Sequence, residues 1–199
     1  MIYFFTTKVM KNGVSMATKF DSINKAHKEF IEKQKMFVIG SAGADGFINV
    51  SPKGMDTFKI VDENTVVWLN HTGSGNETSA HVQENGRMTI MFNSYDKNPL
   101  ILKLYGKATV IHDADSRWDE MAAYFDDFIG TRQFFEMKVE LVLTSCGFGV
   151  PQYEYIGDRN KMLQKWAEKK GRDGMKEYWA EKNAVTLDGV ETKVIEKSK

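Results

Sequence analysis

Two short polar segments contain the residue types that bind an anion. In the first, Asn49-Val-Ser-Pro-Lys-Gly54, the side chains of Asn49, Ser51 and Lys53 are spaced by two, so they point to one face of an extended strand. In the second, His71-Thr-Gly-Ser-Gly-Asn-Glu-Thr78, small polar residues precede a predicted helix. A lysine and the N–H groups of a helix N-terminus both stabilise anions. We therefore predict that the two segments form one anion-binding site.

The glycine-rich segment has the composition of a phosphate-binding loop. Its small residues allow backbone N–H groups to converge, and its hydroxyl groups add donors. The residues that we assign to phosphate binding here are Thr72, Ser74, Gly75, Asn76 and Thr78. Loops of glycine and serine are also common as plain connections, and a lysine such as Lys53 on an edge strand also discourages aggregation. The combination of loop and lysine is what favours a binding site.

Other kinds of chemistry gain little support from the sequence. The four histidines form no closely spaced pair, and Cys146 has no partner at zinc-finger spacing, so we predict no metal site. A Gly-x-Ser-x-Gly motif is missing, which gives a hydrolase triad no support. Arg87 and Arg132 are able to reach a phosphate, but each is equally suited to a surface ion pair with a carboxylate.

The elements that position these segments are mostly strands. Six β-branched or aromatic runs lie between Phe37 and His112, separated by turn residues, and Met137 to Ser145 returns to a strand. This pattern is typical of a barrel or sandwich, with Pro52 at an edge. Helices are predicted after a cap at Asp21 or Ser22, over Glu77–Gln83, over Asp113–Phe128 and after Asp158 with a break at Gly171 to Gly174. The last fifteen residues are expected to be loosely held.

Length and charge limit the classes of protein to which this chain can belong. A chain of 199 residues is expected to form one domain, or one domain with appendages. Its 27 basic and 27 acidic residues create no overall field that attracts nucleic acid or an anionic membrane. One cysteine excludes an internal disulfide framework, and the apolar runs are shorter than the roughly 18 residues of a membrane span. We therefore expect a cytoplasmic protein without a membrane partner.

Two aromatic residues stand on a glycine-rich turn. Phe148 and Tyr153 are flanked by Gly147, Gly149 and Pro151, which indicates a backbone that passes close to a flat group. Contiguous apolar surface of this kind is typical of an interface. We therefore predict that the chain forms a twofold dimer.

Taken in order, the segments resemble the pyridoxamine 5'-phosphate oxidase-like family of FMN-binding split barrels. The resemblance covers about residues 20–157 and is carried by Phe37-Val-Ile-Gly40, Asp45 to Gly54, Val66-Val-Trp-Leu69, Gly73 to Thr78, Asn85 to Phe92 and Leu104 to Ala108. It implies a mainly β (α+β) fold, namely a six-stranded antiparallel split β-barrel with peripheral helices. The domain would occupy residues 20–157, between an N-terminal leader over 1–19 and a C-terminal helical extension with a polar tail over 158–199.

The resemblance also implies a cofactor and an assembly. It implies a homodimer with FMN in each of two clefts between the subunits. Val50 to Lys53 would run along the flavin, and Ser74 to Thr78 would hold its phosphate. Phe148 or Tyr153 would reach the flavin from the second subunit.

This chain also departs from the true pyridoxamine phosphate oxidases. Ile48 stands where those enzymes carry an arginine, and Glu77-Thr78 stands where they carry an Arg-Lys pair. Their C-terminal Arg-Leu-x-Pro segment is replaced by Val194-Ile-Glu-Lys-Ser-Lys. The resemblance therefore supports a flavin site and gives no support to a vitamin B6 substrate site.

Three hypotheses follow for the function. The first is an FMN-dependent oxidoreductase that passes electrons between a reduced donor and a small-molecule acceptor, because the cofactor carries this chemistry without an acid-base residue. The second is a flavin-binding or flavin-sensing protein without turnover. The third is a split barrel that binds another aromatic ligand, such as haem or a deazaflavin.

Overall fold

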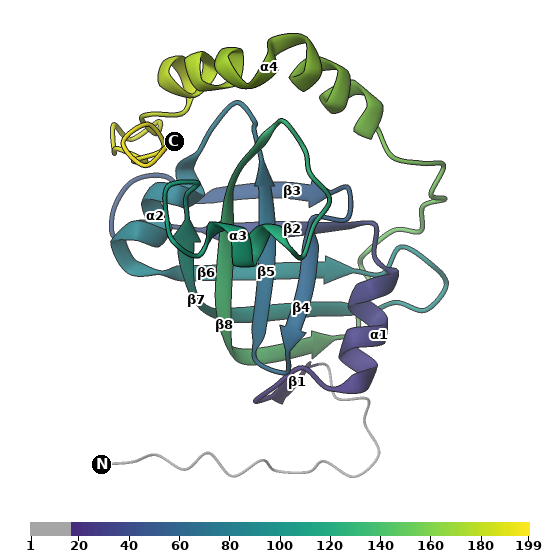
Figure 1. The fold of residues 1–199 in the computed structure, drawn as a ribbon. Helices are drawn as coiled ribbons and strands as arrows, with labels where there is room; N and C mark the ends of the chain where they lie inside the picture. The colour runs from purple at the N-terminus through teal and green to yellow at the C-terminus, as the bar shows by residue number, and fades with distance from the viewer. Residues whose placement is uncertain (1–16) are drawn as a thin grey trace, which may run out of the picture.

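The predicted fold class is confirmed by a computed structural model, which describes residues 17–199 as a curled antiparallel sheet with peripheral helices (Figure 1). The elements in chain order are β1 (Ala17–Phe20), α1 (Lys25–Lys33), β2 (Met36–Ser41), β3 (Asn49–Gly54), β4 (Phe58–Asp62), β5 (Thr65–His71), α2 (Glu77–Asn85), β6 (Arg87–Asn93), β7 (Ile101–Ile111), α3 (Trp118–Ala122), β8 (Thr131–Ser145) and α4 (Asn160–Lys182).

The sheet is a single path of strands with two free ends. Its order is β3-β2-β6-β7-β8-β5-β4, and β1 pairs with β8 beside this path. The long strand β8 pairs with β7 along one side, and on its other side with β5 at its beginning and with β1 at its end. In Figure 1, β2, β3 and β6 run across the page behind β5 and β4, and β8 curves from one half into the other. The result is a split barrel in which β3 is an edge strand.

The core fills the space between the two halves. Buried and half-buried residues alternate along β2 and β6, as expected for strands with one face in a core. The largest cluster draws residues from both halves, including Ile39, Ile90, Leu104, Phe135 and Met137, which are all fully buried. A second cluster on the outer face of β5 and β8 is covered by α3.

The number of strands differs from the expected six. The part of the chain that the structure describes contains eight strands. Seven of them form the path from β3 to β4, and β1 adds a short strand that pairs with the end of β8. Most of the predicted leader, residues 1–16, lies outside the described residues. Its last three residues, 17–19, belong to β1.

The helix boundaries show where local signals were sufficient. The prediction for α2 is confirmed, and Gly86 ends that helix with a left-handed φ of 73°. The break predicted in the last helix is also confirmed, since Gly171 interrupts α4 with φ 67°. The first helix is capped by Asn24 and not by Asp21 or Ser22, because Asn24 Oδ1 accepts a bond from the His27 N–H at 2.9 Å.

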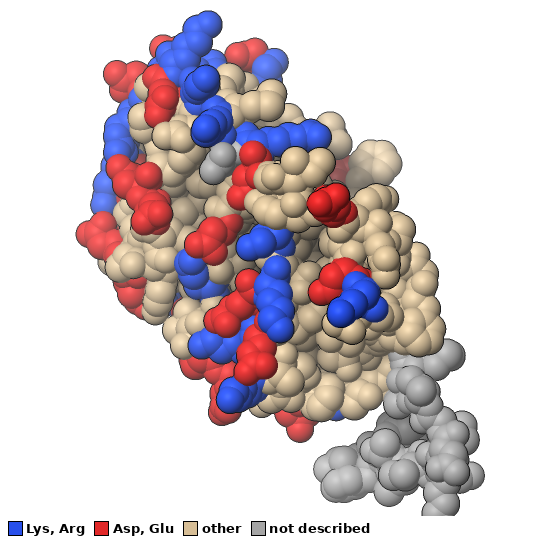
Figure 2. All heavy atoms as spheres, turned by 90° about the vertical axis from the view of Figure 1, so that its right-hand side faces the viewer, with Lys and Arg blue, Asp and Glu red and all other residues tan. Residues whose placement is uncertain are grey.

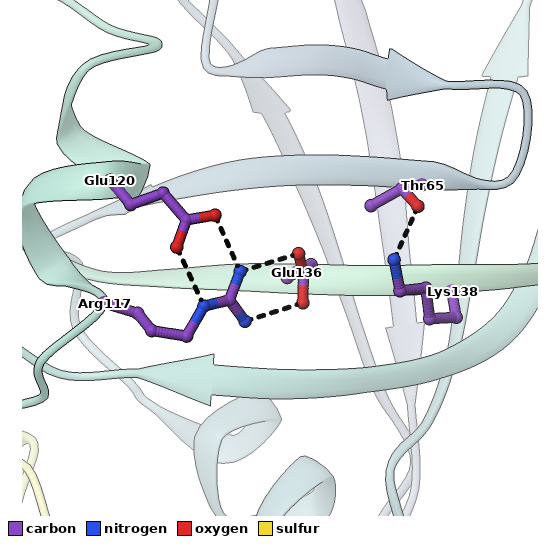
Figure 3. Close-up of polar contacts among 5 residues, drawn as sticks. All are labelled: Thr65, Arg117, Glu120, Glu136 and Lys138. Atoms are coloured by element: carbon purple, nitrogen blue, oxygen red, sulfur yellow. Dashed lines mark hydrogen bonds and ion pairs between the residues drawn. The ribbon is translucent and has the colours of Figure 1, made fainter.

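The predicted helix over 113–128 is wrong in its length. Only Trp118–Ala122 is helical, and a polar cluster holds the segment on the sheet (Figure 3). The Arg117 guanidinium donates to both Glu120 and Glu136, at 2.9–3.0 Å. Hydrogen bonds from Arg117 lower the pKa of the Glu136 carboxyl. This cluster joins Arg117 and α3 to β8 and so holds the short helix against the sheet.

The end of the chain is packed, so the expectation of a loosely held tail is wrong. In Figure 1, α4 runs across the top of the view above the barrel, and the yellow C-terminal segment lies between α4 and α2. Thr192 and Val194 are buried, and the Thr192 carbonyl accepts bonds from Ser79 and Gln83 of α2. Met175 and Trp179 of α4 pack with Val194 in a third apolar cluster. The C-terminal segment is therefore part of the folded protein.

Candidate functional site

The two predicted segments line one cleft at the edge of the sheet. The cleft has a volume of about 540 Å³ and lies between β3, the loop before α2, the start of β8 and the segment after α4. Its lining residues are Phe47, Ile48, Asn49, Ser51, Pro52, Lys53, Gly73, Ser74, Gly75, Glu77, Arg132, Leu187 and Asp188. All three of Asn49, Ser51 and Lys53 line this cleft and are half-buried, whereas Val50 and Pro52 between them are exposed, so the predicted common face is confirmed.

Lys53 is the cation that β3 contributes to the cleft. Its ammonium group lies 5.2 Å from the centre of the Trp68 ring, across the open edge of the barrel. Burial and, to a smaller extent, the nearby positive charge of Arg132 lower the pKa of Lys53 to about 8, and Glu77 opposes this shift. Lys53 is therefore a cation whose charge is incompletely compensated.

Arg132 is a second cation in the same cleft, and its side chain is almost completely buried. Its Nη1 donates to the Gly75 carbonyl at 3.0 Å and to Asn183 Oδ1 at 2.6 Å. With the Asn70 amide turned so that its oxygen faces the guanidinium, Nη2 donates to that oxygen at 3.0 Å. Burial lowers the pKa of Arg132 to about 9, while Glu77 raises it. These hydrogen-bonded partners are neutral oxygens, so the positive charge is not cancelled by a bound carboxylate.

The loop Gly73 to Asn76, which we call the cradle loop, turns its carbonyl groups toward the protein. Asn183 Nδ2 donates to the Gly73 carbonyl at 3.0 Å and to the Ser74 carbonyl at 3.4 Å, and Arg132 donates to the Gly75 carbonyl. In a trans peptide the N–H group points opposite to the carbonyl. The N–H groups of residues 74, 75 and 76 therefore point away from Asn183 and Arg132, and among residues 17–199 none of them has an acceptor.

The hydroxyl groups assigned to phosphate binding differ in their availability. Ser74 is exposed and lines the cleft. The Thr78 hydroxyl is buried and accepts bonds from Asn49 Nδ2 at 3.0 Å and from Ser41 Oγ at 3.2 Å. The Thr72 hydroxyl donates to the Gly130 carbonyl and accepts a bond from Trp179 Nε1 at 2.8 Å. Thr72 and Thr78 thus hold neighbouring elements together, and they do not line the cleft.

Asn76 stands at the N-cap of α2 without capping the helix through its side chain. It is buried, and neither its amide nitrogen nor its amide oxygen has a partner in the part of the chain that the structure describes. An amide buried in this way is costly unless it gains a partner. Asn76 therefore keeps unused donor and acceptor capacity at the end of the cradle loop.

Three other predicted residues lie outside the cleft of one chain. The Val50 side chain is on the opposite face of β3 and is 66% exposed. Phe148 and Tyr153 are 76% and 69% exposed, and the Tyr153 ring packs against Tyr95. Their contact with a cofactor requires a second copy of the chain and stays a prediction.

Sequence reasoning missed the role of five residues. Arg132 appeared suited to a surface ion pair, Glu77 was noted only as a departure from the family, and Asn183, Leu187 and Asp188 fell in the extension and the supposedly loose tail. The cleft brings them together from β8, α2 and the segment after α4. One feature of the sequence could have indicated the role of Arg132: it stands with Gln133 directly before an apolar strand run, where a polar side chain is drawn into the fold.

The described region contains neither a metal-binding cluster nor a membrane-spanning helix. Among residues 17–199 no three His, Cys, Asp or Glu side chains are placed to hold a metal ion. None of the helices in this range is long and apolar enough to cross a membrane. Acidic and basic side chains are interspersed on the face shown in Figure 2.

Comparisons with known proteins give the same family from sequence and the same fold from structure. The sequence profile described as Pyridoxamine 5'-phosphate oxidase matches residues 23–146. The pyridoxamine 5'-phosphate oxidase family protein ustO of Aspergillus flavus is 32% identical over 191 residues, covering 86% of this chain and 76% of that protein.

Two solved structures share the fold at low sequence identity. A variant of HupZ from Group A Streptococcus has a TM-score of 0.51 at 18% identity, covering 61% of this chain and 98% of that chain. A proposed pyridoxamine 5'-phosphate oxidase of Lactobacillus delbrueckii has a TM-score of 0.50 at 14% identity, covering 62% and 94%. Because the profile spans more than half of this chain and the Aspergillus relative is similar along most of it, the chain belongs to the pyridoxamine 5'-phosphate oxidase family.

Proposed function

We propose that the protein binds FMN in the cleft beside β3 and uses it as an oxidoreductase. The observation that carries this proposal is the pair of cations, Lys53 and Arg132, in one cleft. Among the described residues no carboxylate lies within ion-pair distance of either. Burying incompletely compensated positive charge is costly, so such a cleft favours an anionic ligand.

The remaining lining of the cleft fits the other parts of FMN. The free N–H groups of the cradle loop suit a phosphate, and the unpartnered Asn76 amide lies beside them. Phe47, Ile48 and Leu187, which are each more than 70% exposed, offer apolar surface that a flat ring system would cover. Glu77 and Asp188 are the unfavourable groups, because their carboxylates line the same cleft and would repel a phosphate.

In this proposal the protein binds and orients while the cofactor reacts. FMN supplies hydride and electron transfer when it is bound. Lys53, Arg132 and the cradle loop neutralise and orient the phosphate end. Asn49 and Ser51 are linked to each other at 3.3 Å and stand along the strand that would follow the flavin.

The first test is the absorbance spectrum of the purified protein, followed by titration with FMN and with riboflavin. We expect a flavin spectrum and a clear preference for FMN, because only FMN carries the phosphate that the cations neutralise. Equal affinity for riboflavin would contradict the phosphate assignment. A haem or deazaflavin spectrum would support the third hypothesis in place of FMN.

A second measurement separates an enzyme from a flavin-binding protein without turnover. After reduction under anaerobic conditions, small-molecule acceptors are mixed with the protein and the flavin band is followed. An oxidoreductase reoxidises rapidly with a specific acceptor. Equally slow reoxidation by every acceptor would favour a binding or sensing role.

FMN affinity is expected to depend on pH through Lys53. The pKa of Lys53 is about 8 in the unliganded protein, and a bound phosphate dianion would raise it. Binding above pH 8 must therefore take up a proton, so the dissociation constant for FMN should rise between pH 8 and 9 by up to about tenfold. Calorimetry in buffers of different ionisation enthalpy measures this uptake. Riboflavin serves as the control, and an FMN affinity that is flat over this interval would contradict the role of Lys53.

We also propose that the functional unit is a homodimer with FMN between the subunits. The proposal is supported by the exposed aromatics Phe148 and Tyr153, by the apolar residues Phe47 and Ile48 that line the cleft, and by the exposed Val50 on the opposite face of β3. A second copy would cover both surfaces. Residues from two chains would then surround one flavin.

Flavin binding and dimerisation should then be coupled. Diluting the holoprotein toward its dimer dissociation constant should release FMN, and added FMN should restore the dimer, because a ligand shared by two chains stabilises their association. Sedimentation with detection at the flavin band follows both species. A monomer that holds FMN as tightly as the dimer would remove Phe148 and Tyr153 from the site.

A further inference from the structure

We infer that Asn183, the residue directly after α4, is a positioning residue that sets the cradle loop for anion binding. The segment after α4 would thus complete a site whose other parts lie within the family match at residues 23–146. This inference rests on the proposed function in that the cleft binds the phosphate of a flavin.

The Asn183 side chain uses all of its polar atoms at the base of the cleft. It is completely buried, its Oδ1 accepts the 2.6 Å bond from Arg132, and its Nδ2 donates to the carbonyls of Gly73 and Ser74. One amide therefore joins the buried cation to the cradle loop. An amide is suited to this because it offers an acceptor to the guanidinium and donors to the carbonyls.

Asn183 is itself held from two sides. Its N–H donates to the Trp179 carbonyl, which ends α4, and its carbonyl accepts a 2.6 Å bond from Thr192 Oγ1. The Thr192 carbonyl in turn accepts bonds from Ser79 and Gln83 of α2. The side chain is thus fixed relative to the helix whose N-terminus follows the cradle loop.

The consequence for the cradle loop follows from the geometry of the peptide bond. As long as Asn183 holds the carbonyls of residues 73 and 74, the N–H groups of Ser74 and Gly75 must point the other way. Without these bonds the two peptide planes can rotate, and both glycines allow that rotation. Arg132 would also lose its shortest hydrogen bond. Ordering the loop would then have to occur on binding, which weakens affinity.

Two variants and one control test the inference. Asn183→Ala removes both kinds of bond, whereas Asn183→Asp keeps the acceptor for Arg132 but places a negative charge beside it and beside two carbonyls. Thr186→Val is the control, because Thr186 is buried in the same segment and its hydroxyl accepts a bond from the Val190 N–H, away from the loop. Unfolding temperatures and circular dichroism identify variants that are folded.

The first readout is the ratio of the FMN and riboflavin dissociation constants. Both Asn183 variants are expected to weaken FMN binding by about ten- to thirtyfold with little change for riboflavin, since hydrogen bonds in a charged network are lost. Thr186→Val should leave the ratio unchanged. A general structural defect would weaken both ligands equally, and that result would overturn the inference.

The second readout does not require a flavin. Inorganic phosphate is added to the unliganded protein, and the amide resonances of Ser74, Gly75 and Asn76 are followed by NMR. We expect saturable shifts in the wild type and in Thr186→Val, and weaker binding in both Asn183 variants. If phosphate shifts these resonances in the wild type but FMN does not bind, the proposed function fails and the inference is tested by phosphate alone. Equal phosphate affinity in the wild type and the Asn183 variants, or no shift in the wild type, would overturn the inference.

Discussion

Replacing Lys53 by alanine is expected to weaken FMN binding by about ten- to a hundredfold, because the variant lacks a charge-assisted hydrogen bond to the phosphate. The loss should be larger in low salt, since part of it is Coulombic. Riboflavin lacks the phosphate and should bind the variant and the wild type almost equally. Fluorescence titration at neutral pH measures both constants.

Lys59→Ala provides the matched control for this substitution. Lys59 lies on β4, its side chain is 34% exposed, and it pairs with Asp56 at 2.7 Å outside the cleft. Its removal should leave FMN affinity unchanged. If Lys53→Ala bound FMN as tightly as Lys59→Ala, the phosphate would have to lie elsewhere, and Arg132 would be the remaining cation to test.

Gly106→Ala should produce the largest loss of stability. Gly106 lies in β7 at a bulge opposite β8, and a Cβ placed on it would come within 1.9 Å of the Lys138 carbonyl oxygen. That atom belongs to the backbone of the neighbouring strand, so the strands must separate to relieve the clash. We expect the free energy of unfolding to fall by about 3 kcal/mol or more, at or above the upper end for overpacking. Denaturant unfolding followed by circular dichroism measures it.

Gly149→Ala makes the same chemical change at a site with open space. A Cβ on Gly149 would meet no atom within 4 Å. Its effect on the free energy of unfolding should be within about 0.5 kcal/mol, as for ordinary surface substitutions. Similar losses for the two variants would show that the clash at Gly106 is relieved locally.

The parts of the fold that were predictable are those with local signals. Alternating side chains identified β3, and glycine at the end of α2 identified a helix boundary. Segment 113–128 shows the limit of such patterns. It has helical spacing, but one short helix and the following loop already bring Trp118, Met121 and Phe125 onto the sheet. The other residues of segment 113–128 are therefore not needed in a helix to cover this apolar cluster.

The part of the site that was not predictable depends on contacts between distant residues. Charged side chains are usually exposed, so a buried Arg132 bonded to neutral oxygens contradicts the ordinary expectation for arginine. Asn183 is a single amide near the end of a helix, and its partners are loop carbonyls more than 100 residues earlier. Short-range periodicity carries no information about such pairs.

The position of β8 in the sheet also has a consequence for how the protein matures. This strand pairs with β1, β5 and β7, so neither half of the barrel can complete its hydrogen bonding until β8 has been synthesised and docked. Pairings between such distant segments form slowly, because closing a long loop costs chain entropy before the new contacts contribute any stabilisation. One cation of the cleft comes from early strand β3 and the other from late strand β8. A chain that has not finished closing its barrel therefore has no complete site. If the proposed function holds, retention of an anionic cofactor would distinguish mature molecules from folding intermediates.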